Sequence, residues 1–288
     1  MNSRLAGVAL HLSALALFVV MDTLVKRLTV YYAVPQLMWA RFLFSLLGAA
    51  LVIRIATGSL PWRSRAPRLQ AARSLLLAAS NLLFSSALAR IPLADATAVG
   101  FASPVLTVAL AALWLGEPVG WRRWMGVGIG LLGVTIALRP PALTGEAPSN
   151  WAMVLPLGTA MLFAVYQILT RKLATVDDPR TTILHTGFAA TVATSLAQPL
   201  FWTAPPLGDW LLLASRGLLG GAGHGLLVLA FARAPASLLA PLTYTQLIWA
   251  TLAGVLVFND WPDAASLAGA AVIALGGVMV AFPDRDRR

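Results

Sequence analysis

The sequence has no cysteine, only three histidines and few charged side chains, and each shortage excludes a class of protein. Without cysteine there are no disulfides, no thiolate metal ligands and no cysteine nucleophile. The three histidines, His11, His185 and His224, are scattered along the chain, so we expect no metal centre and no other cofactor. Charged residues make up only 11% of the chain, whereas a soluble domain carries roughly a quarter. A soluble globular protein is therefore excluded.

The chain instead is rich in hydrophobic residues, which form 59% of it and give a mean hydropathy of +0.79. They lie in ten runs, each near the length that a helix needs to cross a hydrocarbon core of about 30 Å. The runs are too long and too uniformly apolar to be strands of a membrane barrel. We therefore predict an all-α polytopic membrane protein, embedded in a lipid bilayer. Its ten transmembrane helices are expected at residues 5–25, 34–53, 71–89, 94–115, 122–138, 151–170, 181–202, 211–231, 237–258 and 264–282.

The second half of the chain repeats the first. A shift of 143 positions lays residues 87–140 on residues 230–283, and the same register pairs Arg73 with Arg216. We predict two five-helix repeats, residues 1–140 and 151–288, joined by a polar linker at residues 141–150. Because five is odd, the second repeat must enter the membrane from the opposite side. The repeats are therefore inverted, an arrangement associated with alternating-access transporters.

Lysine and arginine are unevenly divided between the two sides of the predicted bundle. Fifteen lie on the side of the termini, with Arg73 counted among them, and five lie on the other side, with Arg216 among them. Since basic residues gather in cytoplasmic loops, we expect both termini in the cytoplasm and the protein in the inner (plasma) membrane of the cell. The net charge of +10 is then a sign of topology, and no nucleic-acid partner is expected.

Polar residues inside the spans coincide under the repeat alignment. Because a polar group that faces lipid is costly, we predict that they face a common substrate cavity, lined as well by aromatic side chains. The four polar pairs are Asp22/Gln167, Arg41/His185, Asn81/His224 and Ser103/Gln246, and the aromatic residues are Trp39, Phe101, Tyr166, Tyr244 and Trp249. Plainer roles stay open for several of them. Asp22 and Arg41 could only pin two helices together, and His185 could simply be solvated.

Prolines and glycines mark special places in the spans. Pro104 in the fourth span and Pro241 in the ninth each remove a helical hydrogen bond, which produces either a fixed kink or a gating hinge. Gly126 and Gly130 in the fifth span have the spacing of close helix packing. They favour internal packing or a homodimer formed through helix five or ten.

Several segments resemble the EamA-type unit of the drug/metabolite transporter superfamily. They are the hairpin and small-residue helix from Ala87 to Pro104, the acidic residue after the fourth span in Leu115-Gly116-Glu117, the glycine-rich fifth helix ending Leu132-Gly133-Val134 and the segment Trp39-Ala40-Arg41-Phe42. The resemblance covers nearly the whole chain. It implies a ten-helix transporter, and the size and the Trp39–Phe42 segment are similar to those of aromatic amino-acid exporters of that superfamily.

We therefore expect a transporter of small molecules rather than an enzyme. The leading hypothesis is export of amino acids, aromatic or otherwise neutral, or of related small metabolites, by alternating access. One alternative is a proton-coupled exporter of drugs or cationic metabolites that uses Asp22 and a histidine as proton carriers. A membrane-embedded enzyme is disfavoured, because the sequence offers no nucleophile and base at matched spacing.

Overall fold

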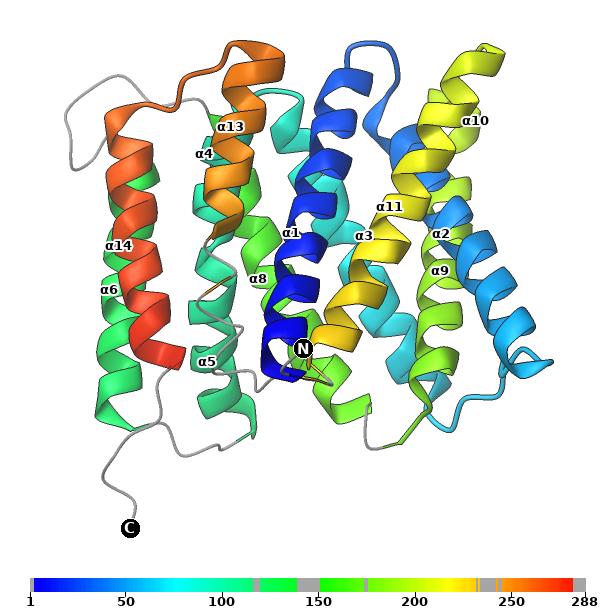
Figure 1. The fold of residues 1–288 in the computed structure, drawn as a ribbon, viewed down its shortest axis with the longest axis horizontal. Helices are drawn as coiled ribbons and strands as arrows, with labels where there is room; N and C mark the ends of the chain where they lie inside the picture. The colour runs from blue at the N-terminus through cyan, green and yellow to red at the C-terminus, as the bar shows by residue number, and fades with distance from the viewer. Residues whose placement is uncertain are drawn as a thin grey trace.

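The computed structural model describes residues 3–115, 120–138, 151–173, 176–231, 233, 242 and 245–281, and helices dominate these ranges (Figure 1). The helices are α1 (Ser3–Leu28), α2 (Val34–Thr57), α3 (Pro67–Leu88), α4 (Leu93–Gly100), α5 (Ala102–Leu115), α6 (Trp121–Leu138), η1 (Trp151–Met153), α8 (Val154–Leu173), α9 (Pro179–Ser195), α10 (Gln198–Phe201), α11 (Leu207–Phe231), α13 (Gln246–Phe258) and α14 (Ala264–Ala281). Each predicted span falls on helix, although the start of the ninth lies outside these ranges. In the described ranges, α1, α2, α3 and η1–α8 are long and apolar enough to cross a membrane by themselves, and further apolar helices are shorter.

The fourth span is broken where proline makes a continuous helix unfavourable. α4 ends at Gly100 and α5 begins at Ala102, with Phe101 between them. Pro104 has no amide hydrogen to donate to the carbonyl of Gly100, so an unbroken helix would lack a bond at this point. The kink expected at Pro104 is therefore present as a break one turn earlier. A gating role for it stays a prediction.

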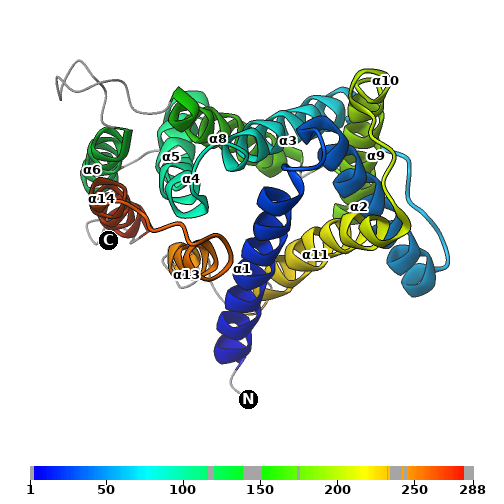
Figure 2. The ribbon, with the colours of Figure 1, turned by 90° about the horizontal axis from the view of Figure 1, so that it is seen from above.

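The helices pack as pairs that exchange when the two repeats are exchanged. The repeat makes α1 equivalent to α8, α2 to α9, α3 to α11, α4–α5 to α13, and α6 to α14. Accordingly α1 packs on α11 while α3 packs on α8, and α2 packs on α11 while α3 packs on α9. The pairs α2–α9, α4–α13 and α6–α14 each join equivalent helices. Figures 1 and 2 show these pairs as two groups, with α6 and α14 at one end and α2, α9 and α11 at the other.

The pair α6–α14 is a glycine seam in which the two repeats make the same contact. A Cβ added to Gly133 would lie 2.8 Å from the carbonyl oxygen of Gly269, and a Cβ added to Gly276 would lie 2.5 Å from that of Gly126. Gly133 is equivalent to Gly276, and Gly269 to Gly126. The glycines thus let the two backbones touch. The glycines that suggested a homodimer pack within the chain. A homodimer through these helices is untested and stays a prediction.

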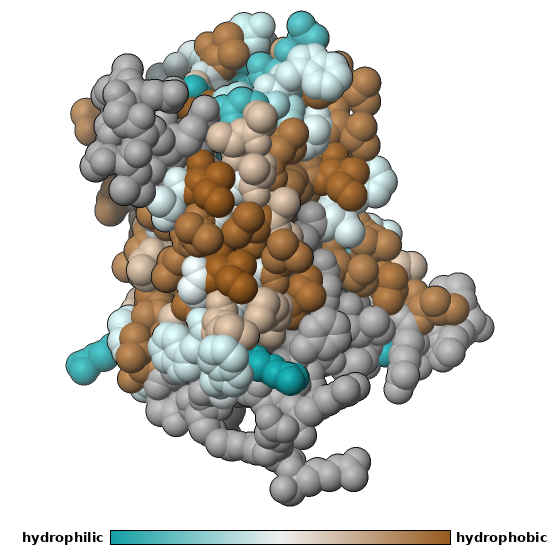
Figure 3. Space-filling view, turned by 90° about the vertical axis from the view of Figure 1, so that its left-hand side faces the viewer, coloured by the Kyte–Doolittle hydropathy of each residue, from teal (hydrophilic) through white to brown (hydrophobic). Residues whose placement is uncertain are grey.

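The outer surface suits a bilayer. Figure 3 shows the face over α6 and α14, where brown hydrophobic side chains cover the middle and hydrophilic ones gather toward the two ends. Large apolar side chains are exposed there, including Leu132 and Leu275, at 57% and 62%. An apolar belt between two polar rims is the surface that a membrane-spanning helical protein presents to lipid.

Candidate functional site

Three arginines lie inside the bundle, on three different helices. Arg41 of α2, Arg73 of α3 and Arg216 of α11 are 6%, 5% and 0% exposed. The sequence analysis placed Arg73 and Arg216 among the flanking charges, and that placement was wrong. Each helix begins four residues before the predicted run, so both arginines lie well inside their helices, where their side chains are buried. With both removed from the count, the basic residues still favour the side of the termini by fourteen to four.

Arg73 is held by hydroxyl groups of the second repeat. Its guanidinium donates from Nε to Thr170 at 2.6 Å, from one terminal nitrogen to Thr186 at 2.6 Å and from the other to the Tyr166 hydroxyl at 2.7 Å. Both threonine hydroxyls in turn donate to carbonyls of their own helices. Arg73 therefore joins α3 to α8 and α9 through a well-satisfied network.

Arg216, the equivalent of Arg73, has poorer partners. One terminal nitrogen donates to the backbone carbonyl of Leu37, and the other lies 3.9 Å from the sulfur of Met38. Its Nε is buried without a hydrogen-bond partner among the described residues. The charges of Asp22 and Arg41 act on it as well. Arg216 thus fixes α11 to α2 and adds positive charge beside Asp22.

Asp22 and Arg41 face each other without forming an ion pair. Each acts electrostatically on the other, and the side chain of Asp22 is 8% exposed. Neither makes a hydrogen bond or an ion pair with any residue in the described ranges. A Cβ added to Gly220 would lie 3.6 Å from Arg41 Nε and 3.1 Å from the Met21 sulfur, so the lack of a side chain here lets α11 pack closely against the guanidinium. The two charged groups therefore keep most of their hydrogen-bonding capacity.

His224 connects this region to an open stretch of α11. Its ring lies 5.0 Å from the ring of Phe18, and the charges of both Arg41 and Arg73 act on it. A Cβ added to Gly221 or Gly225 would meet no atom within 4 Å. His224 is exposed, and yet the charges of arginines from α2 and α3 act on it. We therefore interpret this open space as the interior of the bundle.

These groups form one arginine cluster, which we define as Asp22, Arg41, Arg73, Tyr166, Arg216 and His224. Its charged members are three guanidinium groups and a single carboxylate, so the cluster has an excess of positive charge. Four of its members, Asp22, Arg41, Tyr166 and His224, were predicted from the sequence. Phe18, Asp22 and Lys26 follow one another at four-residue spacing, so one face of α1 leads from His224 past the cluster to the end of the helix.

Other residues predicted to line the cavity lie away from the cluster. Trp39 donates to Ser195 at 3.0 Å and packs edge-on against Trp202 and Trp210. His185 lies in the first half of α9, with its Nε2 2.8 Å from the carbonyl oxygen of Trp62. The solvated role left open for His185 matches this position.

The remaining predicted residues divide between packing and helix contacts. Phe101 is buried in an apolar core with Val134 and Ile273, and the Ser103 hydroxyl is buried without a hydrogen-bond partner among the residues that the structure describes. Asn81 donates to the carbonyl of Leu77 in its own helix. Gln167 bridges two helices by donating to Thr107 of α5 at 3.4 Å. Gln246 is half-buried, and Trp249 is 43% exposed. Tyr244 and Pro241 lie outside the described residues.

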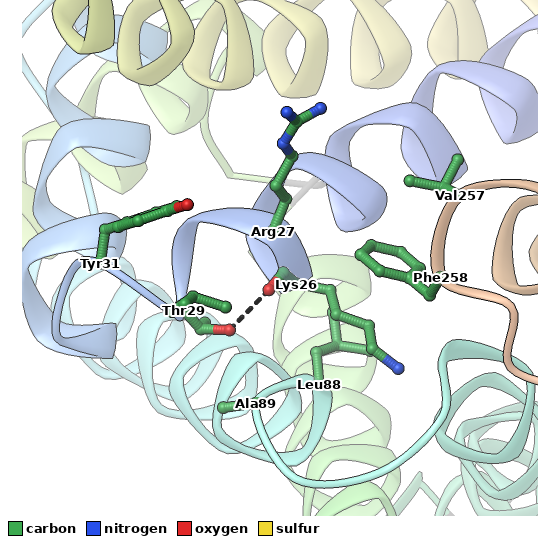
Figure 4. A pocket seen from close by; sticks show the side chains of 9 residues that line it. Lys26, Arg27, Thr29, Tyr31, Leu88, Ala89, Val257 and Phe258 are labelled. Carbon is green, nitrogen blue, oxygen red and sulfur yellow. Dashed lines mark hydrogen bonds between the residues drawn. The ribbon is translucent and has the colours of Figure 1, made fainter.

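A pocket of about 530 Å³ opens at the end of the bundle where α1 and α3 finish (Figure 4). The residues that line it are Lys26, Arg27, Thr29, Val30, Tyr31, Leu88, Ala89, Val257 and Phe258. The Lys26 ammonium forms an ion pair with Asp260 and donates to the carbonyl of Ile91 at 3.3 Å. This ion pair ties the first repeat to the loop after α13. The described residues that were predicted to contact substrate are absent from the pocket lining.

Equivalent loop residues fasten the two ends of the bundle. Asp177, between α8 and α9, accepts hydrogen bonds from the Ser64 hydroxyl, the Arg65 amide and the Gln70 side chain. Burial by itself would raise the pKa of Asp177, but these hydrogen bonds and the nearby His185 hold it below its ordinary value. We name this group the inner pin, because the topology predicted from the sequence expects it on the cytoplasmic side.

The position equivalent to Asp177, at a shift of 145, is Tyr32. Its hydroxyl donates to the Asp209 carboxylate at the start of α11, and we name this pair the outer pin. The hydrogen bond to Asp209, with burial and the negative charge of Asp209 as further causes, raises the pKa of Tyr32 to about 12. The pins join the α1–α2 loop to α11 and the α8–α9 loop to the start of α3.

The described part of the chain holds no group of three or more histidine, aspartate or glutamate side chains that could bind a metal ion. The arrangement inside the bundle instead offers charges and hydrogen-bond donors for a small solute. Buried charges on membrane helices generally mark such a pathway.

The comparisons with known proteins agree on the kind of protein. The EamA-like transporter family matches residues 5–139 and again residues 150–282. An S-adenosylmethionine uptake transporter of Rickettsia conorii is 24% identical over 285 residues, covering 99% of this chain and 95% of the relative. A riboflavin transporter of Vibrio cholerae is 32% identical over 186 residues, covering 64% and 61%. A solved crystal structure shares the fold, with a TM-score of 0.63 and 22% identity over 97% of this chain and 96% of that one. The resemblance seen in the sequence is confirmed, and the chain is a multi-pass membrane transporter of the EamA-like family within the drug/metabolite transporter superfamily.

Proposed function

We propose that this transporter moves amino acids or closely related metabolites that carry a carboxylate, by alternating access between its inverted repeats. The observation that supports this most is the composition of the arginine cluster, where three guanidinium groups face one carboxylate. A carboxylate on the solute would reduce the excess of positive charge, and arginine binds carboxylates with charge-assisted hydrogen bonds.

The named relatives agree with this solute class in part. S-adenosylmethionine, which the Rickettsia transporters take up, carries an amino-acid head group, whereas riboflavin, named for the Vibrio transporter, has a flat ring system and no carboxylate. Phe18, Tyr166 and His224 offer ring surfaces beside the charges. The names of the relatives give no support to export specifically, so direction is measured together with the solute.

The cluster disfavours the alternative of a cationic-drug exporter. A cationic solute that lacks a carboxylate would add positive charge to a region that already has three arginines and one aspartate. Since like charges in a low-dielectric interior repel strongly, only Asp22 could offset that cost. S-adenosylmethionine is also a cation, but it carries a carboxylate that arginine can bind.

Transport by purified protein in liposomes tests the proposal. The liposomes are loaded with unlabelled solute, and counterflow of labelled amino acids, S-adenosylmethionine or riboflavin is recorded from both sides. We expect counterflow with one or more amino acids or with S-adenosylmethionine. Counterflow only with solutes that lack a carboxylate, such as riboflavin or quaternary amines, would contradict the proposed carboxylate requirement.

A cavity-filling substitution tests the location of the pathway. Gly221→Leu places a side chain where an added Cβ meets nothing within 4 Å, so the helix should fold normally while transport falls more than about tenfold. Gly128→Leu is the matched control, because that glycine on α6 is equally unobstructed but lies outside the cluster. Equal transport in the two variants would move the pathway away from α11.

The proposal includes an inner-membrane location with both termini in the cytoplasm, supported by the distribution of arginine and lysine. The absence of cysteine makes the test direct. Arg63→Cys reports the α2–α3 loop and Ala204→Cys the α10–α11 loop. An impermeant maleimide added to intact cells should label the second and spare the first, and the reverse pattern would invert the topology.

A further inference from the structure

The three arginines of the cluster differ in how far the protein satisfies them. Arg73 donates to three hydroxyl groups, and Arg216 is fully buried against a carbonyl and a sulfur atom of α2. Arg41 has no hydrogen-bond partner in the described ranges, and its guanidinium lies over the face of the Phe42 ring, 5.5 Å from the ring centroid. Of the three, Arg41 is therefore the guanidinium with the most donors left for a ligand.

Asp22 is in the same condition with the opposite charge. It lies within reach of the charges of Arg41 and Arg216, yet forms no ion pair with either. A charge pair whose role was to pin α1 to α2 would close to hydrogen-bonding distance, because an open buried pair loses hydration without gaining a contact. The gap between the two groups argues against the pinning role that the sequence left open.

The surroundings of the two groups are small and apolar, and open space begins one residue away. Gly220 packs against the Arg41 guanidinium and the Met21 sulfur, whereas a Cβ added to Gly221 would meet no atom within 4 Å. Met21 and Phe18 of α1 provide apolar surface on the same side. A ligand that carries two oppositely charged groups on one carbon atom, and an apolar part that extends toward His224, fits this arrangement.

We propose that Arg41 and Asp22 together form a receptor for the zwitterionic head group of an α-amino acid, Arg41 binding the carboxylate and Asp22 the ammonium. Arg73 and Arg216 are positioning residues that hold the helices around it. This inference rests on the proposed function and adds to it that the solute must carry both charges.

Competition against the labelled amino acid that the wild-type protein transports best is the test. For phenylalanine, the competitors are phenylalanine itself, phenethylamine, which lacks the carboxylate, and 3-phenylpropionate, which lacks the ammonium. Wild-type protein should bind each analogue about tenfold or more weakly than phenylalanine, as expected for the loss of a charge-assisted hydrogen bond. If 3-phenylpropionate competes equally well, the receptor is wrong while the carboxylate-carrying function stands. If none of the three competes and no amino acid is transported, the proposed function fails as well.

Two substitutions assign the charges. Arg41→Gln should weaken phenylalanine about tenfold and leave phenethylamine within about threefold of its wild-type value, because the amine has no carboxylate to lose. Asp22→Asn should also weaken phenylalanine about tenfold and leave 3-phenylpropionate within about threefold of its wild-type value, because this acid has no ammonium to lose. Equal weakening of all three compounds by both variants would reduce Asp22 and Arg41 to a structural role and overturn the proposal.

Matched controls remove the same charges elsewhere. Arg54→Gln lies on the same helix as Arg41, near its other end and exposed, and Asp178→Asn keeps a residue that can cap α9. Both should retain the wild-type order of competition. The selectivity of the wild-type protein decides the matter even where a variant does not fold.

Discussion

The two repeats are equivalent in the glycine seam and different in the arginine cluster. In the seam, Gly133 rests on Gly269 as Gly276 rests on Gly126, so exchange of the repeats reproduces the contact. In the cluster, Arg73 donates to three hydroxyl groups, whereas its equivalent Arg216 has one carbonyl and one sulfur atom. Backbone packing has kept the symmetry of the repeat and the polar interior has lost it. Binding an asymmetric solute in one orientation requires this loss of symmetry in the polar interior, because two identical half-sites would bind it equally in either orientation.

The largest expected effect lies in the seam. Gly133→Ala and Gly276→Ala each place a Cβ within 2.6 Å of backbone atoms of the partner helix, which cannot move aside as a side chain can. We expect each to cost about 3 kcal/mol of unfolding free energy, at the upper end of overpacking penalties. Thermal unfolding in detergent measures it. The control Gly128→Ala meets nothing within 4 Å and should be neutral.

The two seam variants should also cost the same within about 0.5 kcal/mol, since exchange of the repeats makes their contacts equivalent. A clear inequality would show that the seam, too, has lost its symmetry, and the contrast with the cluster would disappear.

A smaller effect is expected where the arginines differ. Arg73→Met removes three charge-assisted hydrogen bonds and should cost about 2 kcal/mol, because the threonine hydroxyls keep their own backbone acceptors. Arg216→Met removes a buried charge whose Nε has no partner among the described residues and leaves one backbone carbonyl without its donor, so it should cost less than Arg73→Met. Unfolding of the two variants under one condition measures the difference. Equal destabilisation would mean that Arg216 is held as well as Arg73.

The same contrast explains how much of the fold was predictable from the sequence. Hydropathy and an internal repeat are properties of long segments, so ten spans and the inverted arrangement followed without knowledge of any single contact. The break in the fourth span followed from the missing amide hydrogen of Pro104.

The site was predictable only in part. Asp22 and His224 stood out because each is polar within an apolar run, but Arg73 and Arg216 lie near the ends of runs and resembled loop charges. The signal that could have found them was present, since they align as an identity in the repeat. Identical arginines in equivalent helices are hard to explain as topology signals, because inversion places them on opposite sides of the membrane.

The aromatic residues were less predictable. Trp39 joins Trp202 and Trp210 near one end, and Phe101 is buried in an apolar core. A tryptophan in an apolar run carries no information about which neighbour it faces. Its direction depends on tertiary packing, which the composition of a single helix does not encode.

Acid should weaken the inner pin selectively. The pKa of Asp177 is lowered in the folded protein, so its carboxylate contributes stability that is present above the ordinary aspartate pKa and is lost as pH falls through the lower, folded value. The melting temperature of the wild-type protein should therefore fall below about pH 4. Asp177→Asn should remove this part of the fall, while Asp178→Asn next to it should not. Parallel curves for both variants would show that the inner pin adds no acid-sensitive stability.

High pH should weaken the outer pin, whereas low pH weakens the inner pin. We expect this effect on stability to be the smallest. Since the pKa of Tyr32 is raised to about 12, its hydrogen bond to Asp209 contributes stability that is complete below the ordinary tyrosine pKa and is lost as pH rises through the folded value. The chain has only four tyrosines, so near-ultraviolet absorbance of the phenolate can follow each titration. Tyr32→Phe should remove a titration step near pH 12, and Tyr31→Phe, at a neighbouring position that is 69% exposed, should leave that step in place. If Tyr32 titrated near pH 10 like a free tyrosine, its hydrogen bond to Asp209 would add no stability. The equivalent loop residues would then stabilise only one end of the bundle.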